Sequence, residues 1–450
     1  MSSPRSRARE AALAALVAVE EGAHLDRALH KADLLGGNDV RERALARRII
    51  RGTLQARGRI DWILDRVLHR GGPSGLDPWT RNALRVGLYQ ILYLSSIPSR
   101  AAVHETVRIA RLRGGETAAG LVNAVLRRVL RDGVPEGVPP LEEDPVGHLS
   151  VVESYPAWLV ARWVGRLGVE KAAERLRAGN RTPPLSLRVL PPGDAHRAAR
   201  EIEKEGRKVR GSSVCPGVLL LPDGGDPSTL RPFREGRVLV QDEGAALAGS
   251  AAGPVAEGAR VLDLCAAPGG KLLTLAASGR AGETFTGMDR SPWRMGRLRD
   301  NRERLGLGGV RLIVADALRP PLRPGVRFDL VLVDVPCTGL GTLGRRADLR
   351  WRVREEDISR LAGLARRLLA EAAELVEPGG HLVYSTCTTE PEENEEVIAG
   401  FLRADRRYRV VPPEVPLPGG ALGPDGTVRV LPEVHGCDGA FAARIRRVAE

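Results

Sequence analysis

Apolar positions in the first 132 residues recur with the period of an α-helix. Hydrophobic side chains return every three to four positions, which places them on one face of each predicted helix. Pro98 directly follows one apolar stretch and supports a helix end there. The pattern therefore predicts an all-helical bundle over residues 5–132, with helical spacing at positions 11–17 and 25–29 and helices over 52–68, 81–94, 103–112 and 120–130.

The pattern changes after this bundle. Residues 133–144 are rich in Gly, Pro and acids, which is typical of a linker. A helical pattern returns over residues 155–179. Beyond it, residues 180–190 predict a strand, 195–205 a helix and 218–221 a second strand. We therefore expect a small α+β segment between the bundle and the rest of the chain.

The C-terminal half alternates short apolar strands with helical segments. The predicted strands cover 261–264, 283–289, 310–316, 328–334 and 381–387, and residues 429–445 predict a turn into a last strand. This alternation favours an α/β fold with a parallel, doubly wound sheet. Such sheets bind ligands at the carboxyl ends of their strands. The polar residues at those ends are Asp289, Asp316, Asp334 and Cys387.

Residues 259–271 read A-R-V-L-D-L-C-A-A-P-G-G-K. They predict a buried strand, a tight turn of small residues and the start of a helix. Small residues let the backbone approach a ligand, and a helix N-terminus offers free N–H groups. The stretch is neither G-x-G-x-x-G nor a P-loop, so the usual dinucleotide and triphosphate patterns do not apply. On its own it indicates a nucleotide-type ligand and no more.

The charge balance suggests a partner. The 450 residues carry a formal net charge of +12, and the sequence pI is about 10.1. A basic balance favours a polyanionic partner, most simply nucleic acid, although a genome-wide bias in composition is the alternative. The content of 43% hydrophobic and 28% charged residues is ordinary for a soluble globular protein, and this length predicts two or three domains.

The cysteines argue for a reducing compartment. Their number is odd and no C-x-x-C pair occurs, so we expect neither a disulfide framework nor a metal site, and we expect a cytoplasmic protein. No apolar run is long enough to span a bilayer, so no membrane partner is expected. The five cysteines are Cys215, Cys265, Cys337, Cys387 and Cys437, of which we expect the first and the last to be packed thiols.

Three motifs, taken together and in order, carry a resemblance to a known family. C-A-A-P-G-G-K, D-V-P-C-T-G-L-G and S-T-C-T resemble the motifs of the RsmB/Sun (Fmu) branch of RNA cytosine-C5 methyltransferases, which use S-adenosylmethionine. In the bundle, L-R-V-G-L-Y-Q-I-L-Y-L and L-V-N-A-V-L-R-R-V-L-R resemble the NusB-like RNA-binding domain that begins RsmB proteins. The resemblance implies a NusB-like all-helical RNA-binding domain over 1–140, a linker and small α+β RNA-binding subdomain over 141–232, and a Rossmann-like class I S-adenosylmethionine-dependent catalytic core over 233–450.

The resemblance also implies a cofactor site. Asp289 would take both ribose hydroxyls, Asp316 would meet the adenine amine, and Asp334 would lie within reach of the cofactor. The methionine end would be wrapped by Cys265, Ala266, Ala267, Pro268, Gly269, Gly270 and Lys271.

Methylation at carbon 5 of cytosine requires covalent catalysis, because this carbon is a poor nucleophile. A low-pKa thiolate that adds to carbon 6 makes carbon 5 nucleophilic enough to attack a sulfonium methyl group. Cys337 and Cys387 are the two candidates, and two buried structural thiols are the alternative reading. The P-C cysteine attacks in cytosine methyltransferases acting on DNA, whereas the T-C cysteine attacks in the RNA family. The resemblance therefore implies Cys387 as nucleophile, Cys337 in product release and Asp334 as the carboxylate at the cytosine edge.

The activity implied is S-adenosylmethionine-dependent methylation of a 16S rRNA cytosine to 5-methylcytosine by a monomer. The RNA partner would be small-subunit rRNA or its assembly intermediate. A tRNA methyltransferase and a catalytically inert NusB-like RNA-binding adaptor are the rivals. Where the family has an arginine pair followed by His-Pro, this chain has Gly344, Arg345, Arg346 and Ala347, a departure that bears on substrate specificity. Which cytosine is modified stays open.

Overall fold

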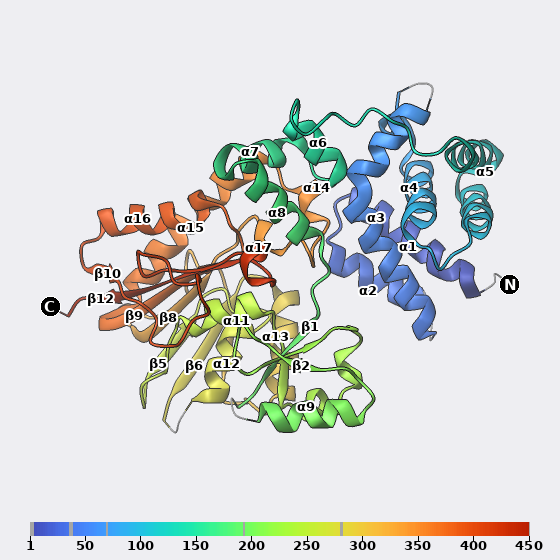
Figure 1. Cartoon of the computed structure of the whole chain (residues 1–450). Coiled ribbons are helices and arrows are strands. Elements are labelled where there is room, and N and C mark those ends of the chain that lie inside the picture. Colours follow the sequence, from blue (N-terminus) through green and yellow to red (C-terminus); the bar gives the residue numbers. More distant parts are fainter. Residues whose placement is uncertain (1–3, 36–38, 69–70, 192–193, 280–281, 450) are drawn as a thin grey trace. The chain divides into compact units, whose positions relative to one another are not determined.

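The computed structural model describes residues 4–35, 39–68, 71–191, 194–279 and 282–449. The chain divides into two compact units. The first contains Met1–Asn180 together with Arg346–Val353, and the second contains Arg181–Arg345 together with Arg354–Glu450. Figure 1 shows the whole chain and labels many of the elements of both units.

The first unit is all-helical, as the apolar pattern predicts. Asp39 and Asp77 accept hydrogen bonds from backbone N–H groups of the first turns of α3 and α4, and so cap these helices. Within α5, Gly115 has a φ of 71°, which kinks the chain between the two helices predicted over 103–112 and 120–130. The helices are α1 (Pro4–Glu20), α2 (Leu25–Leu35), α3 (Val40–Val67), α4 (Pro78–Tyr93), α5 (Ser99–Asp132), α6 (Pro145–Val152), α7 (Ala157–Leu167), α8 (Val169–Asn180) and α14 (Leu349–Arg352).

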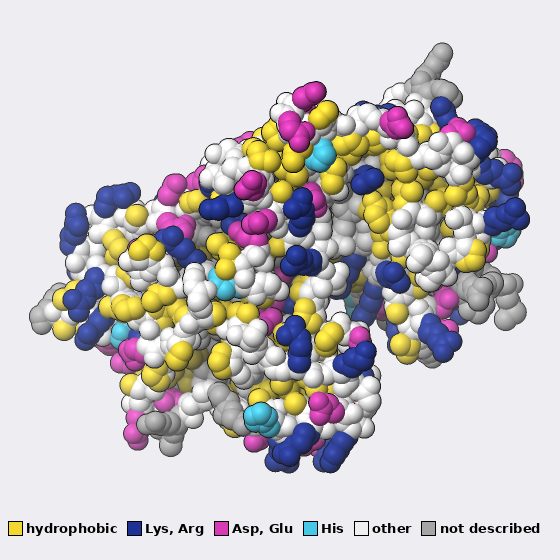
Figure 2. All heavy atoms as spheres, viewed as in Figure 1, with side chains coloured by type: hydrophobic (Ala, Val, Ile, Leu, Met, Phe, Trp, Pro, Cys, Tyr) yellow, Lys and Arg dark blue, Asp and Glu magenta, His cyan; other side chains and the backbone are white. Residues whose placement is uncertain are grey.

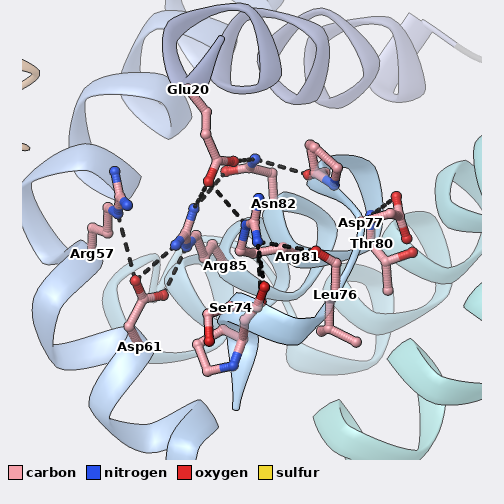
Figure 3. A network of polar contacts seen from close by, with 12 residues as sticks. Glu20, Arg57, Asp61, Ser74, Leu76, Asp77, Thr80, Arg81, Asn82 and Arg85 are labelled. Carbon is pink, nitrogen blue, oxygen red and sulfur yellow. Dashed lines mark hydrogen bonds and ion pairs between the residues drawn. The ribbon is translucent and has the colours of Figure 1, made fainter. Parts of the chain in front are cut away.

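An ion-pair network lies inside this bundle, between side chains of α1, α3 and α4 (Figure 3). Arg85 donates through Nε and Nη2 to the two carboxylate oxygens of Asp61, at 2.7 and 2.8 Å. Glu20 accepts from Asn82 Nδ2 at 2.5 Å and lies 2.9 Å from Arg81 Nε. Each acid therefore faces a cation from a neighbouring helix, which offsets the cost of removing charge from water.

The segment Arg346–Val353 comes from the C-terminal half of the sequence but belongs to the helical unit. Arg350 is fully buried, donates to Asn180 Oδ1 at 2.7 Å and stacks its guanidinium 3.9 Å from the centre of the Tyr155 ring. Ala347, at one of the positions that depart from the family pattern, is buried in the core of the helical bundle. Burial of these side chains holds the segment in this unit.

The second unit opens with a small antiparallel sheet of order β2-β3-β1-β4. Ala198 and Ile202 on α9 pack against Leu187 and Leu219 of this sheet. The predicted strand–helix–strand segment is therefore present. Its elements are β1 (Leu185–Val189), α9 (Ala195–Lys204), β2 (Arg210–Gly211), β3 (Val218–Leu221), α10 (Arg231–Arg234) and β4 (Val238–Val240).

A larger sheet of order β10-β12-β9-β8-β5-β6-β7 fills the rest of this unit, and β11 pairs with β12. The pairs β9–β8, β8–β5, β5–β6 and β6–β7 are parallel, whereas β12 runs antiparallel to β9. The strands are β5 (Arg260–Asp263), β6 (Thr284–Asp289), β7 (Arg311–Val314), β8 (Phe328–Asp334), β9 (Val376–Thr386), β10 (Tyr408–Val410), β11 (Val428–Val430) and β12 (Ala440–Arg447).

Helices cover both faces of the larger sheet, which is why its central strands β5 and β8 are largely apolar and buried. Val261 and Leu332 pack into one cluster with residues of α12 and α13, whereas Leu262 and Val331 pack into another with residues of α15. The helices are α11 (Glu243–Ser250), α12 (Gly270–Ser278), α13 (Pro292–Arg304), α15 (Glu355–Glu374), α16 (Glu395–Ala404) and α17 (Pro432–His435). This is a Rossmann-like arrangement, and the predicted α/β fold is confirmed. Among the described residues, no helix is long and apolar enough to cross a membrane.

Candidate functional site

The candidate residues converge at one edge of the larger sheet. Because β6, β5, β8 and β9 are consecutive parallel neighbours, their carboxyl ends meet there. Asp289 ends β6, Asp263 ends β5, Asp334 ends β8 and Cys387 follows β9. Asp316 lies just beyond β7 and is exposed. The fold thus gathers residues that are far apart in the sequence.

The turn Cys265–Lys271 connects β5 to α12. Gly269 caps α12 with a φ of 106°, a conformation that favours glycine. A Cβ at this position would lie 2.4 Å from Leu298 Cδ1 and 2.7 Å from Leu273 Cδ1. The backbone N–H of Ala266 donates to a β6 carbonyl at 2.8 Å. The turn is therefore small and tied to the sheet, which suits the close approach of a ligand.

Asp289 offers an unused acceptor. It is 3% exposed, and its Oδ1 accepts from the backbone N–H of Ser291 at 2.9 Å. Its Oδ2 has no hydrogen-bond partner among the described residues, and Arg294 Nη1 lies 3.5 Å away. Since a buried acceptor without a hydrogen bond is unfavourable, a ligand hydroxyl fits this position. Asp316 Oδ1 accepts from the backbone of Leu318 at 3.0 Å, as in a turn.

Lys271 links the turn to the D-V-P-C motif. Its Nζ lies 2.7 Å from Asp334 Oδ2, and Asp334 Oδ1 accepts from Ser385 Oγ at 2.7 Å. Burial lowers the pKa of Lys271, but Asp334 above all, with Asp263 and Cys387, more than offsets burial, so the pKa is raised. Lys271 is therefore a cation whose field reaches Cys387 and favours a thiolate there.

Asp263 is a buried acid that the sequence analysis does not single out. It is 1% exposed and accepts from the backbone N–H of Cys265 at 3.2 Å. Burial and then the charge of Asp334 raise its pKa to about 7, against the opposing effect of Lys271. Strongly shifted carboxyls of this kind concentrate at functional sites. Its position at the end of strand β5 is the sequence feature that could have indicated Asp263 as a candidate.

The two candidate cysteines lie side by side. Cys337 Sγ and Cys387 Sγ are 3.4 Å apart, and the backbone N–H of Cys387 points to Cys337 Sγ at 3.4 Å. The hydrogen bond with Cys387, and then burial, raise the pKa of Cys337 well above its ordinary value. Cys337 is therefore held as a neutral thiol next to its partner sulfur.

A buried carboxylate joins the loops that carry these cysteines. Glu393 accepts from the backbone N–H of Thr338 at 2.8 Å and from its hydroxyl at 2.5 Å. The hydroxyls of Thr338 and Thr388 are 2.9 Å apart. Burial raises the pKa of Glu393 to about 7, although the threonine hydrogen bonds act in the opposite direction. Sequence reasoning misses Glu393, for which the E-P-E-E-N run after S-T-C-T is the available signal.

The remaining cysteines have no such surroundings. Cys215 and Cys437 are buried, and burial raises the pKa of each thiol. Cys265 is also shifted upward, by burial and by the nearby charges of Asp263 and Asp334. No group of three or more metal-ligating side chains occurs in the described part of the chain. The pair Cys337 and Cys387 is therefore distinguished by its proximity.

Basic side chains do not gather in one place on the visible face. Figure 2 shows Lys and Arg distributed over it, with Asp and Glu among them. Some arginines serve the fold, such as Arg345, which pairs with Asp242 at 2.5 Å and Asp438 at 2.9 Å. The net positive charge therefore does not by itself mark a path for RNA.

Comparison with known proteins identifies the family of this chain. The NusB family model matches residues 6–131, and the model described as 16S rRNA methyltransferase RsmB/F matches residues 253–446. A protein of Bacillus subtilis named probable ribosomal RNA small subunit methyltransferase B is 33% identical over 98% of both chains. The chain belongs to the RsmB/F family of rRNA methyltransferases.

Two further similarities support this membership. The ribosomal RNA small subunit methyltransferase B of Pseudomonas putida is 34% identical over 91% of this chain and 92% of that protein. The crystal structure of a methyltransferase homolog protein from Pyrococcus horikoshii is 28% identical, with a TM-score of 0.57, over 66% of this chain and 97% of that chain. The expected family and fold class, a NusB helical domain with a Rossmann-like methyltransferase fold, are confirmed.

Proposed function

We propose that this RsmB/F protein transfers a methyl group from S-adenosylmethionine to carbon 5 of a cytosine in 16S rRNA, through a covalent bond between Cys387 and carbon 6 of the base. The observation that carries this proposal is the pair of sulfurs 3.4 Å apart beside the ion pair of Lys271 and Asp334. The relatives named as small subunit methyltransferases support the class of RNA.

The residues around the β5–α12 turn fit the cofactor. S-adenosylmethionine, when bound, supplies an electrophilic methyl group on a sulfonium. Cys265–Lys271 would hold its methionine end, and the unbonded Oδ2 of Asp289 suits a ribose hydroxyl. We assign the adenine amine to Asp316.

Cys387 is the nucleophile in this proposal. Its thiolate, favoured by the Lys271 ammonium, forms a bond to carbon 6, and the electron pair of the C5–C6 double bond moves to carbon 5. Asp334, held by Lys271 and Ser385, receives the N3/N4 edge of the flipped base. Carbon 5 would then take the methyl group from the sulfonium, and the electron pair of the broken S–CH3 bond would stay on that sulfur.

Release completes the reaction. The proton on carbon 5 leaves to a water molecule, its electron pair re-forms the C5–C6 double bond, and the bond between carbon 6 and sulfur breaks with its electron pair left on the Cys387 sulfur. Cys337 is a neutral thiol 3.4 Å from the departing sulfur and shares its proton with it. The role of Cys337 is therefore in release of the product.

RNA docking is assigned to the NusB-like helical domain and the small sheet of the second unit. The test is incubation of the purified protein with radiolabelled S-adenosylmethionine and either unmodified small-subunit rRNA or tRNA, followed by bisulfite mapping. One protected rRNA cytosine is the expected result. Label on tRNA alone would overturn the substrate, and no label on either RNA despite bound cofactor would favour the inert adaptor.

The roles of the two thiols have their own test. Cys337→Ala should leave attack intact and slow release, so a covalent protein–RNA adduct should accumulate and survive a denaturing gel. Cys387→Ala should form no adduct. An adduct with Cys387→Ala and none with Cys337→Ala would reverse the two roles.

A further inference from the structure

Glu393 takes no part in the steps above, yet its side chain contacts the residue next to Cys337. It ends the short helix η4 (Pro391–Glu393) and is 1% exposed. Its Oε1 accepts from the backbone N–H of Thr338 at 2.8 Å, and its Oε2 accepts from the Thr338 hydroxyl at 2.5 Å. The carboxylate therefore holds the P-C loop at two points beside the thiol.

The same group of contacts reaches the second cysteine loop. Thr388, the residue after Cys387, places its hydroxyl 2.9 Å from that of Thr338. Asn394 Nδ2 donates to the backbone carbonyl of Thr388 at 3.1 Å. The hydroxyl of Tyr384 in β9 donates to the backbone carbonyl of Glu393, which fixes η4 to the sheet. Both cysteine loops are thus connected through one carboxylate.

We propose that Glu393 is a positioning residue that acts through Thr338 to hold the Cys337 thiol against Cys387. A buried carboxyl is costly unless it is hydrogen-bonded, and here both oxygens accept from Thr338, whose hydroxyl lies 2.9 Å from that of Thr388 in the second cysteine loop. The catalytic consequence rests on the proposed function. The placement of the two sulfurs does not, and it can be measured without RNA or cofactor.

The first experiment measures how readily the two thiols form a disulfide. Diamide takes up two electrons and two protons as two thiols become one disulfide, and mass spectrometry of alkylated peptides gives the rate of the Cys337–Cys387 link. Glu393→Gln and Thr338→Val should each slow this link by about 10-fold, because the sulfurs lose their fixed approach. Glu396→Gln, the same change at an exposed residue of α16, should leave the rate unchanged.

The second experiment follows methyl transfer in the same variants. Glu393→Gln should lower kcat by about 100-fold and lower KM for RNA with it, at unchanged kcat/KM and cofactor affinity, because a displaced Cys337 slows only release, which follows methyl transfer. The covalent adduct should accumulate relative to wild type, which general loss of structure would not cause. The double variant with Thr338→Val should be no slower than the slower single variant, because the two residues act as one unit.

The outcomes separate this proposal from the proposed function. Disulfide formation in Glu393→Gln as fast as in Glu396→Gln overturns the positioning role, whatever the activity. If the wild-type protein methylates no RNA and Glu393→Gln still slows disulfide formation, the positioning role is supported and the proposed function is overturned. If circular dichroism shows that Glu393→Gln does not fold, the rate of disulfide formation is measured in Thr338→Val instead. An unchanged rate in that variant overturns the proposal.

Discussion

Two buried polar clusters in this molecule treat charge in opposite ways. In the ion-pair network of the helical unit, Arg85 makes two hydrogen bonds to Asp61 and Glu20 lies against Arg81 (Figure 3). At the edge of the larger sheet, Glu393 is bonded to threonine groups, and its pKa is raised to about 7 by burial. The acids of the first cluster face arginines, whereas at the sheet edge the pKa values of Asp263 and Glu393 are raised and Asp334 is paired with a cation, Lys271.

The difference separates a structural use of charge from a chemical one. A buried pair of opposite charges stays fixed, and removal of one member leaves the other uncompensated. Carboxyls with a pKa near neutrality, such as Asp263 and Glu393, exchange protons under working conditions and concentrate at reactive sites. The sheet-edge cluster consists of Asp263, Asp334, Cys337, Cys387 and Glu393. Substitutions in it should therefore change the reaction, whereas those in the ion-pair network should change stability.

Cys387→Ala should show the largest effect on the reaction. Removal of the proposed nucleophile should lower methyl transfer at least about 10⁴-fold, measured as label in RNA, because in the proposed mechanism no other group forms the covalent bond. Cofactor affinity by calorimetry and the urea midpoint should stay at wild-type values. Cys215→Ala, at a buried thiol away from the pair, serves as control. Equal activity in the two variants would remove the sheet-edge cluster from the chemistry.

Asp334→Asn should have the second largest effect on the reaction. The variant keeps the shape of the side chain but loses the charge that faces Lys271 and the base edge. We expect kcat to fall by about 10²- to 10³-fold, as when a preorganised polar group is lost. Asp316→Asn, at an exposed acid beyond β7, should instead weaken cofactor binding with little change in kcat. The reverse pattern would exchange the roles of the two acids.

The sequence pattern predicts most of the fold because periodicity reports burial within each element. β8 begins and ends where predicted, since its apolar run is buried on both faces. β7 is shorter than predicted because Asp316 already forms a turn with Leu318. Membership of Arg346–Val353 in the helical unit is not predictable, since it depends on contacts such as that of Arg350 with Asn180.

The residues of the candidate site are likewise predictable from the sequence only in part. Cys337, Cys387 and Asp334 stand in motifs that resemble a known family, so the sequence alone indicates them. The contact between the two sulfurs requires β8 and β9 to be neighbours, which only the folded sheet shows. Glu393 carries no motif of its own and becomes informative through its bonds to Thr338.

Arg85→Met tests the structural side of the comparison. The change leaves Asp61 without its two strongest hydrogen bonds and should lower the free energy of unfolding by about 3 kcal/mol, the low end for a broken buried pair because both acids are partly exposed. Urea unfolding followed by circular dichroism measures it. Arg111→Met breaks an exposed pair with Glu116 and should cost less than about 1 kcal/mol. An equal cost in both variants would mean that the ion-pair network is not a structural device.

Glu393→Gln should change the pH dependence of stability, the smallest effect. The folded carboxyl, with a pKa of about 7, keeps a proton that the unfolded chain releases near 4.5. Its favourable contribution is therefore complete below pH 4.5 and is lost as the pH rises through 7. Glutamine does not ionise, so from pH 5 to pH 8 wild type should lose about 2 kcal/mol relative to the variant, measured by urea unfolding at each pH.

Asp263 is present in both proteins, so its own titration cancels from this difference. Glu396→Gln supplies the control, because it makes the same change of charge at an exposed residue of α16, and it should give a curve parallel to wild type. If the curve of Glu393→Gln also ran parallel to wild type, burial would not shift the titration of Glu393 on folding. The two clusters would then handle charge alike, and the distinction between them would rest on the thiols alone.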